Sequence, residues 1–255
     1  MSKINGIYAA SVSILDKNLR LDITKTIKHT ENLIDQGCHG VAILGSTGQA
    51  QLISLEEKIK LIEQLSTSKY KENFIIGTGL NSLNDTILLM KVSKSYNFEK
   101  LCGYKFSIEC VETLVKKYPK QIIGVKDSSY NLYENLSIDN FSILPGSELK
   151  LLKGLELGCS GIITATCNVT ANLSRKVYDD FKNKKDQKYN EKLCNVRASF
   201  DKYNLISGMH SFLSEADNCY NNLLPPLSLL NESDKKKLFD ELNKLDFNLE
   251  FLKVA

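Results

Sequence analysis

The feature that most constrains the fold of this chain is a regular alternation between two kinds of segment. Over the first two thirds of the sequence, short apolar runs rich in β-branched residues are followed by longer stretches with helical periodicity. This alternation is typical of βαβ units, in which helices join parallel strands. The predicted strands are Gly6–Ile14, Gly40–Leu44, Phe74–Gly79, Gln121–Val125, Phe141–Leu144 and Gly161–Thr166.

Several of the intervening segments carry helix start and stop signals. Ser54 and Glu57 form a capping box, so we expect a helix to begin at Leu55. Gly37 and Gly158 stand where a helix ends before the next strand. The predicted helices are Asp22–Gln36, Leu55–Thr67, Asn84–Lys94, Ile108–Tyr118, Glu148–Leu157, Ser174–Asn183, Asp186–Tyr203, Met209–Tyr220 and Ser233–Leu245.

The length and the order of these segments predict one large α/β domain. The chain has 255 residues, close to the roughly 250 of a TIM (β/α)₈ barrel, and two ordinary domains are the alternative. We predict a (β/α)-barrel catalytic domain in residues 1–172, followed by the last barrel helix and a C-terminal helical extension in residues 173–255. Because no low-complexity linker divides the two parts, we expect the extension to pack on the barrel.

Composition excludes several classes of partner. The net charge is only +3, and the three arginines, Arg20, Arg175 and Arg197, are too few and too scattered for a nucleic-acid surface. No apolar run approaches the roughly 20 residues of a membrane span, and the amino terminus lacks a signal core, so we expect a cytoplasmic protein with neither nucleic acid nor membrane as partner. The histidines have no metal-ligand spacing, so no metal site is predicted.

Lys126 is the most informative single residue. It follows the apolar run Ile122–Val125 and should therefore stand at the carboxyl end of a buried strand, where parallel barrels carry their catalytic groups. Burial disfavours the charged form of a lysine and makes its neutral, nucleophilic amine more available. The alternative is a structural lysine that reaches solvent or pairs with Asp127.

Other polar residues follow or interrupt apolar stretches. The turn Gly45–Gly48 comes after a predicted strand, and its hydroxyls and backbone amides can bind a carboxylate. Tyr96 could relay protons beside an imine-forming lysine, and Glu148 could hold substrate hydroxyls. Each of these residues also fits an ordinary structural role.

Taken together, the motifs resemble the dihydrodipicolinate synthase and N-acetylneuraminate lyase superfamily of pyruvate-dependent class I aldolases. The similarity runs in the right order along nearly the whole chain. The matching motifs are Gly37–Gly48 with Leu55–Lys58, then Gly77–Gly79, Ile123–Ser129, Gly161–Asn168 and Leu224–Leu227.

The resemblance implies a role for each candidate residue. Lys126 would form an imine with pyruvate, and Tyr96 would relay the proton. The pyruvate carboxylate would be held by Ser46, Thr47 and Gly48, with Thr47 counted among the catalytic residues.

The same resemblance implies the rest of the site and its partners. The backbone near Ile163 would line the pyruvate pocket, and Gly146 and Glu148 would face the second substrate. An imine is an electron sink that lets carbon–carbon bonds form or break without a metal, so no cofactor is implied. The expected partners are a 2-keto acid (pyruvate) and an aldehyde, and the relatives' dimers and tetramers imply a homo-oligomer.

Two departures from the family pattern affect this interpretation. Leu101 stands where the lysine-pathway synthases carry an arginine, five residues after the tyrosine, which favours a sugar-acid aldolase. Ser95 also runs straight into Tyr96, so roughly 40 residues are missing relative to the family, somewhat more than one βα unit. We expect this gap to remove the fourth strand, the fourth helix and most of the fifth strand. Residues 91–107 could supply a substitute strand, with Gly103–Ser107 as the candidate.

The sequence therefore leaves three functions in order of preference. The first is a Schiff-base lyase or synthase that cleaves or forms a 2-keto-3-deoxy sugar acid or acylneuraminate. The second is 4-hydroxy-tetrahydrodipicolinate synthase of lysine biosynthesis. The third, from a different class, is a barrel that has lost catalysis through the deletion and serves as a binding protein.

Overall fold

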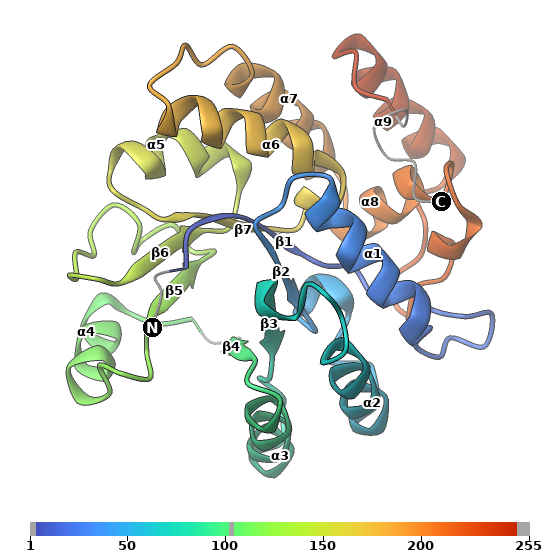
Figure 1. Cartoon of the computed structure of the whole chain (residues 1–255). Coiled ribbons are helices and arrows are strands. Elements are labelled where there is room, and N and C mark those ends of the chain that lie inside the picture. Colours follow the sequence, from blue (N-terminus) through green and yellow to red (C-terminus); the bar gives the residue numbers. More distant parts are fainter. Residues whose placement is uncertain (1–3, 102–104, 249–255) are drawn as a thin grey trace.

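The computed structural model describes residues 4–101 and 105–248, and its strands form two parallel sheets (Figure 1). The larger sheet has the strand order β4-β3-β2-β1-β7, and the smaller one pairs β5 with β6. All ladders between these strands are parallel. The strands are β1 (Gly6–Ala10), β2 (Gly40–Ile43), β3 (Phe74–Gly77), β4 (Glu99–Leu101), β5 (Gly124–Asp127), β6 (Ser142–Pro145) and β7 (Gly161–Thr164).

Helices surround the strands on the outside, which makes the fold an α/β barrel of the TIM type (Figure 1). Most predicted helices are confirmed within a few residues of their expected ends. The helices are α1 (Ile23–Asp35), α2 (Leu55–Leu65), α3 (Leu83–Ser95), α4 (Ile108–Lys117), α5 (Leu151–Glu156), α6 (Cys167–Lys182), α7 (Asn190–Asp201), α8 (Leu205–Leu213) and α9 (Glu232–Lys244).

The interior of the barrel is filled by alternate side chains of the strands. Ala10, Ala42, Ile75, Leu144 and Ile163 form one buried cluster there. Strands β2, β3, β6 and β7 are buried along their whole length, as expected when a parallel sheet is covered on both faces.

The ring of strands is not closed by hydrogen bonds in the described part of the chain. The amide of Ser160 donates to the carbonyl of Ile143 over 2.9 Å and joins the β6 and β7 region. No ladder joins β4 to β5 within the described ranges, and Figure 1 shows α3 and α4 on either side of this break. On β4, Glu99 and Lys100 are exposed, and charged side chains are a common protection for an unpaired edge strand.

The strand after α3 corrects one expectation. We expected a substitute strand at Gly103–Ser107, but the structure has β4 at Glu99–Leu101, directly after the helix. Residues 105–107 are irregular, and residues 103 and 104 lie outside the described residues. The strand that pairs with β3 thus comes from residues 91–107, and the expected loss of the family's own fourth strand stays a prediction.

The C-terminal extension packs on the barrel through a second apolar core. Val12 and Ile14, which follow β1, lie in one buried cluster with Phe200, Phe212 and Leu238 of α7, α8 and α9. Helix α6 begins at Cys167 rather than at the predicted Ser174, because the β-branched Val169 and Thr170 obscure its first turns in the sequence. The extension is thus anchored beside the end of β1 that carries the candidate site.

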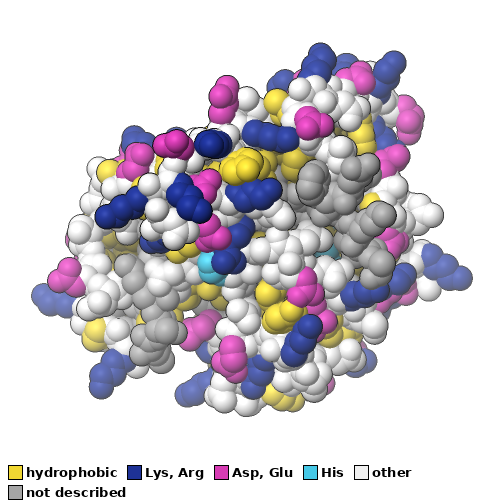
Figure 2. Space-filling view, turned by 45° about the horizontal axis from the view of Figure 1, so that its top comes forward, with side chains coloured by type: hydrophobic (Ala, Val, Ile, Leu, Met, Phe, Trp, Pro, Cys, Tyr) yellow, Lys and Arg dark blue, Asp and Glu magenta, His cyan; other side chains and the backbone are white. Residues whose placement is uncertain are grey.

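The surface shows charges of both signs. In Figure 2, basic and acidic side chains are interspersed over the visible face rather than gathered into one basic stripe. None of the helices in residues 4–101 and 105–248 combines the length and the apolar character that crossing a membrane requires.

The capping box of α2 gives a direct test of the local fold. The Ser54 hydroxyl accepts from the amide of Glu57, and the Glu57 carboxylate accepts from the amide of Ser54, both at 3.3 Å. Replacing Ser54 by alanine should lower the free energy of unfolding by about 1 kcal/mol, because the amide of Glu57 loses the hydroxyl that accepts its hydrogen bond. Urea denaturation measures this change, with Ser228→Ala, an exposed serine outside any helix, as the control. Equal stability of the two variants would contradict the cap.

Candidate active site

Lys126 lies on β5, one residue before the strand ends at Asp127. It is in register with Leu144 of β6, and register partners in a parallel ladder point to the same face. Leu144 belongs to the interior cluster of the barrel. The side chain of Lys126 is therefore directed to the barrel interior at the carboxyl end of the strand, as the sequence predicts.

The neighbouring Asp127 does not neutralise this lysine. Its buried carboxylate accepts hydrogen bonds from the amides of Ser129, Tyr130, Leu132 and Tyr133, at 2.8–3.0 Å. Within residues 4–101 and 105–248, Lys126 forms no ion pair. The alternative of a structural Lys126–Asp127 pair is thereby excluded.

A buried ion pair lies close to Lys126 at the carboxyl end of β7. The Arg197 guanidinium, on α7, donates through Nη1 to Glu148 Oε2 over 2.9 Å and to Thr164 Oγ1 over 2.9 Å. Glu148 also accepts from the hydroxyls of Thr164, Thr166 and Thr170, at 2.6–2.9 Å. Glu148 and Thr164 have no exposed surface, so this network is part of the core.

Burial, and secondarily the positive charge of Arg197, lower the pKa of Lys126 below its ordinary value. A lower pKa leaves more of the side chain as the neutral amine near pH 7. That form can attack a carbonyl carbon, whereas the ammonium cannot.

Two residues expected to face a second substrate have other contacts in the structure. Both carboxylate oxygens of Glu148 are occupied by Arg197 and threonine hydroxyls, and the residue is fully buried. The amide of Gly146 donates to the carbonyl of Asp127 over 2.9 Å. A Cβ at Gly146 would lie 2.6 Å from the Ser128 hydroxyl, so a side chain there would require this hydroxyl to move. Glu148 and Gly146 thus shape the wall of the site.

The predicted carboxylate-binding turn follows β2. Residues Ser46–Gly48 form a short 3₁₀ turn in which Thr47 is buried and Ser46 is exposed. A Cβ at Gly48 would lie 2.8 Å from the Ser13 hydroxyl and 3.0 Å from the Ser11 carbonyl. The turn therefore packs against the loop that follows β1, and its glycine makes this approach possible.

The remaining expected pocket residue lies on β7. Ile163 is buried in the interior cluster, together with Leu144, the register partner of Lys126. Lys126, the Ser46–Gly48 turn and the end of β7 all belong to the carboxyl ends of parallel strands. In a barrel of this type these ends face one side of the molecule, where active sites lie.

The structure does not bring Tyr96 to this side. Tyr96 is the C-cap of α3, and Asn97 follows it in the left-handed conformation with φ of 61°. The amide of Phe98 returns to the carbonyl of Ser93 over 3.0 Å, which ends the helix before β4 begins. Tyr96 thus precedes a strand, at its amino end, whereas Lys126 lies at the carboxyl end of β5. The expected proton relay from Tyr96 is inconsistent with this placement.

The interpretation of Leu101 changes for the same reason. Leu101 is the last residue of β4 and packs against the interior cluster, so it does not follow a catalytic tyrosine. The chain nevertheless has no arginine between Arg20 and Arg175. This part of the chain therefore still lacks the arginine that the lysine-pathway synthases carry.

Arg197 is the site residue that sequence reasoning missed. It was noted only as one of three arginines, and its partner Glu148 lies 49 residues earlier in the chain. Its i,i+4 contact with Asp201, at 2.8 Å, was readable from the sequence as a helical pair. The contact with Glu148 has no local signal.

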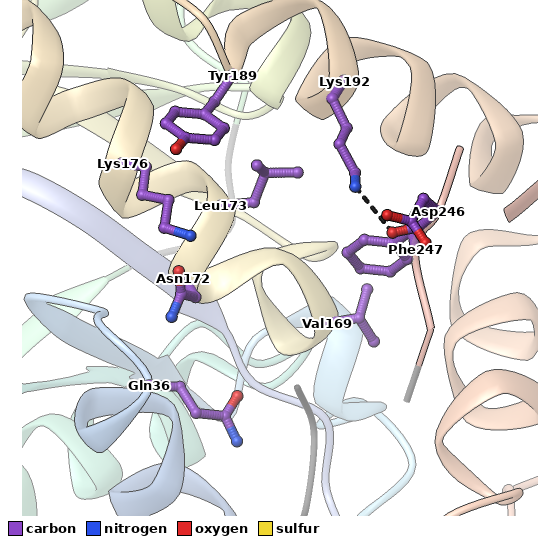
Figure 3. Close-up of a pocket in the computed structure, with 9 residues that line it drawn as sticks. All are labelled: Gln36, Val169, Asn172, Leu173, Lys176, Tyr189, Lys192, Asp246 and Phe247. Carbon is purple, nitrogen blue, oxygen red and sulfur yellow. Dashed lines mark hydrogen bonds between the residues drawn. The ribbon is translucent and has the colours of Figure 1, made fainter. Parts of the chain in front are cut away.

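A separate cavity of about 110 Å³ lies in the outer layer of helices (Figure 3). Its lysines already have partners: Lys192 donates to the carbonyl of Asp246 over 2.8 Å, and the Lys176 ammonium lies 5.2 Å from the centre of the Tyr189 ring. None of the candidate catalytic residues lines this cavity. Its lining consists of Gln36, Val169, Asn172, Leu173, Lys176, Tyr189, Lys192, Asp246 and Phe247.

The fold and the site define a parallel-barrel protein with a lysine of lowered pKa at a strand end. The model of the dihydrodipicolinate synthetase family matches the chain in two segments, residues 3–96 and 91–245. The chain belongs to this family, whose members are lyases of the class I aldolase type. The two matches meet at residues 91–96, next to the place where we predict a shortening; the shortening itself stays a prediction.

Individual relatives agree with this assignment. An uncharacterized DapA-like lyase of Chloroflexus aurantiacus is 25% identical over 58% of this chain, and the match spans 65% of that relative. A 4-hydroxy-tetrahydrodipicolinate synthase of Listeria monocytogenes is 29% identical over 64% of this chain and 71% of its own length. The structure of N-acetylneuraminate lyase from Fusobacterium nucleatum has the same fold, with a TM-score of 0.79, 20% identity, and coverage of 96% of this chain and 99% of that one.

The charge environment of Lys126 can be tested without any substrate. Competitive acetylation by acetic anhydride, read by mass spectrometry across a pH series, should give Lys126 a labelling midpoint below the roughly 10.4 of an ordinary lysine. Arg197→Met should move this midpoint upward, because the cation that disfavours a second positive charge is removed. Lys202→Met, which removes a surface cation paired with Glu241, is the matched control and should leave the midpoint in place. An ordinary midpoint in the unmodified protein would contradict the assignment.

Proposed function

We propose that this chain is a pyruvate-dependent lyase in which Lys126 forms an imine and a 2-keto-3-deoxy sugar acid or acylneuraminate is cleaved or formed. The observation that carries the proposal is a lysine that forms no ion pair within the described residues, is directed into the barrel at a strand end, and has its pKa lowered by burial and by Arg197. The family assignment supports the same chemistry.

The proposed reaction begins at the amine of Lys126. The neutral amine adds to the keto carbon of the substrate, and loss of water from the resulting carbinolamine gives a protonated imine. The C4 hydroxyl then loses its proton to water, the bond between C3 and C4 breaks, and its electron pair moves into the imine, which gives an enamine and releases an aldehyde. Protonation of the enamine and hydrolysis of the imine then release pyruvate and restore the amine.

The turn after β2 is proposed to hold the substrate carboxylate. Ser46 and Thr47 offer hydroxyls and backbone amides, and Gly48, whose amide donates to the carbonyl of Gly45 over 3.1 Å, lies beside them. The backbone near Ile163 would close the other side of the keto acid. Such donors are neutral, so they can bind the carboxylate without raising or lowering the charge near Lys126. No cofactor takes part in this scheme.

The second candidate is 4-hydroxy-tetrahydrodipicolinate synthase, the name carried by the Listeria monocytogenes relative. It shares the imine with pyruvate but adds a second substrate with its own carboxylate. The lack of an arginine between Arg20 and Arg175 favours the sugar-acid reaction, because the bidentate partner for that carboxylate is missing from this part of the chain. The resemblance to the family also supports a homo-oligomer that works in the cytoplasm.

The proposal predicts a covalent adduct. Incubation with pyruvate and sodium borohydride should add one reduced pyruvate to the protein, and peptide mapping should place it on Lys126. Lys58 is an internal control, because it is also buried but donates to the carbonyl of Ile53 over 2.8 Å. The adduct should be absent from Lys126→Ala and from the peptide that contains Lys58.

The trapping result decides between the classes of function. A Lys126 adduct justifies a screen of keto-deoxy acids for cleavage, with the synthase reaction tested in parallel. Folded protein that gives no adduct would overturn the enzymatic proposal and leave a non-catalytic binding protein as the better account.

A further inference from the structure

The segment between α8 and α9 reaches back to the loops that form the proposed carboxylate site. Residues 220–224, here called the clamp segment, contact the loops that follow β1 and β2. The amide nitrogen of the Asn222 side chain donates to the carbonyl of Leu15 over 3.1 Å. The backbone amide of Leu224 donates to the side-chain oxygen of Gln49 over 2.9 Å. Gln49 directly follows the Ser46–Gly48 turn.

A third contact runs through the buried interior of the molecule. The hydroxyl of Tyr220 lies 2.9 Å from His29 Nδ1, and His29 Nε2 lies 2.8 Å from Asn168 Oδ1. Asn168 in turn accepts from the amide of Val12 over 3.1 Å and donates to the carbonyl of Ala10 over 2.8 Å. These two backbone groups flank Ser11, whose carbonyl packs against Gly48.

The direction of these hydrogen bonds follows from the groups themselves. Asn168 Oδ1 accepts from a backbone amide, so the oxygen is the atom that faces His29 and must accept from Nε2. The remaining nitrogen of a neutral imidazole is an acceptor, so His29 Nδ1 accepts a hydrogen bond from the Tyr220 hydroxyl. Burial lowers the pKa of His29 to about 4, which keeps the ring neutral near pH 7.

Through these hydrogen bonds the clamp segment, which lies outside the barrel, holds the loops that follow β1 and β2. The proposed site binds a carboxylate with hydroxyls and backbone amides alone, and such donors are effective only when they are held in position before the ligand arrives. Within the described ranges no ladder joins β4 to β5. The hydrogen bonds between strands therefore do not hold these loops by themselves, and other contacts must help to position them.

We propose that Tyr220, Asn222 and Leu224 are positioning residues that hold the Ser46–Gly48 turn and the loop after β1 in the geometry that binds the substrate carboxylate. The C-terminal extension is then a working part of the site rather than a covering for the barrel. This inference rests on the proposed function, because the carboxylate site belongs to that proposal.

Tyr220→Phe removes one hydroxyl and leaves the ring that packs in the second core. The first readout is hydrogen–deuterium exchange of the peptide that contains residues 46–50, which should become faster in Tyr220→Phe and in Gln49→Met. The second readout is borohydride trapping as a function of pyruvate concentration. The half-saturating concentration should rise by roughly threefold to tenfold, the effect of one lost hydrogen bond, while the maximal trapping rate stays unchanged.

The control is Tyr203→Phe, a tyrosine of the same extension that packs against the same core. It should change neither readout. If hydrogen exchange at residues 46–50 is unchanged in Tyr220→Phe and Gln49→Met, the proposed positioning role of the clamp segment is wrong. An equal fall in trapping at all pyruvate concentrations would contradict it as well. Absence of any adduct in the unmodified protein would overturn the proposed function instead, and the exchange measurement would still decide whether the clamp holds the turn.

Discussion

The parallel alignment of the strands is the constraint on which the rest of the structure depends. Because every ladder runs in the same direction, the chain arrives at one side of the molecule each time a strand ends. Lys126, the Ser46–Gly48 turn and the threonines after β7 come from distant parts of the sequence but share that side. The chemistry of the site follows from this geometry, since a lysine on the interior face of a strand is both desolvated and reachable from the open end of the barrel.

Two polar networks complement the strand ladders around the site. The Glu148–Arg197 pair ties the end of β6 to α7 and the end of β7, and the clamp segment ties α8 and α9 to the loops after β1 and β2. Buried charges and buried histidine are costly unless each polar atom has a partner. The hydrogen bonds of Glu148, Arg197 and His29 therefore favour this arrangement of the loops, because an arrangement that breaks them leaves buried polar groups without partners. Within residues 4–101 and 105–248 no ladder joins β4 to β5, so these networks add contacts around the site that hydrogen bonds between strands do not supply.

The sequence predicted the strands around the site and the position of Lys126, because continuous apolar runs and capping residues are local signals. It failed where the signal was ambiguous or distant. The strand expected within residues 91–107 was placed too late in the chain, because Glu99 and Lys100 are exposed and lack the apolar pattern of a buried strand. Tyr96 was predicted to relay protons beside Lys126, although an asparagine after a helical pattern, here Asn97, also marks a helix end. The partners of Glu148 and Tyr220 lie far away in sequence, so no local pattern could reveal them.

The central claim is that Lys126 and the turn after β2 act on the same substrate molecule. A crystal structure of the protein soaked with pyruvate tests it most directly. The account predicts continuous density from Nζ of Lys126 to the keto carbon, with the carboxylate of the same molecule against Thr47 and Gly48. Pyruvate bound elsewhere, or bound on that turn without a covalent link to Lys126, would contradict the account.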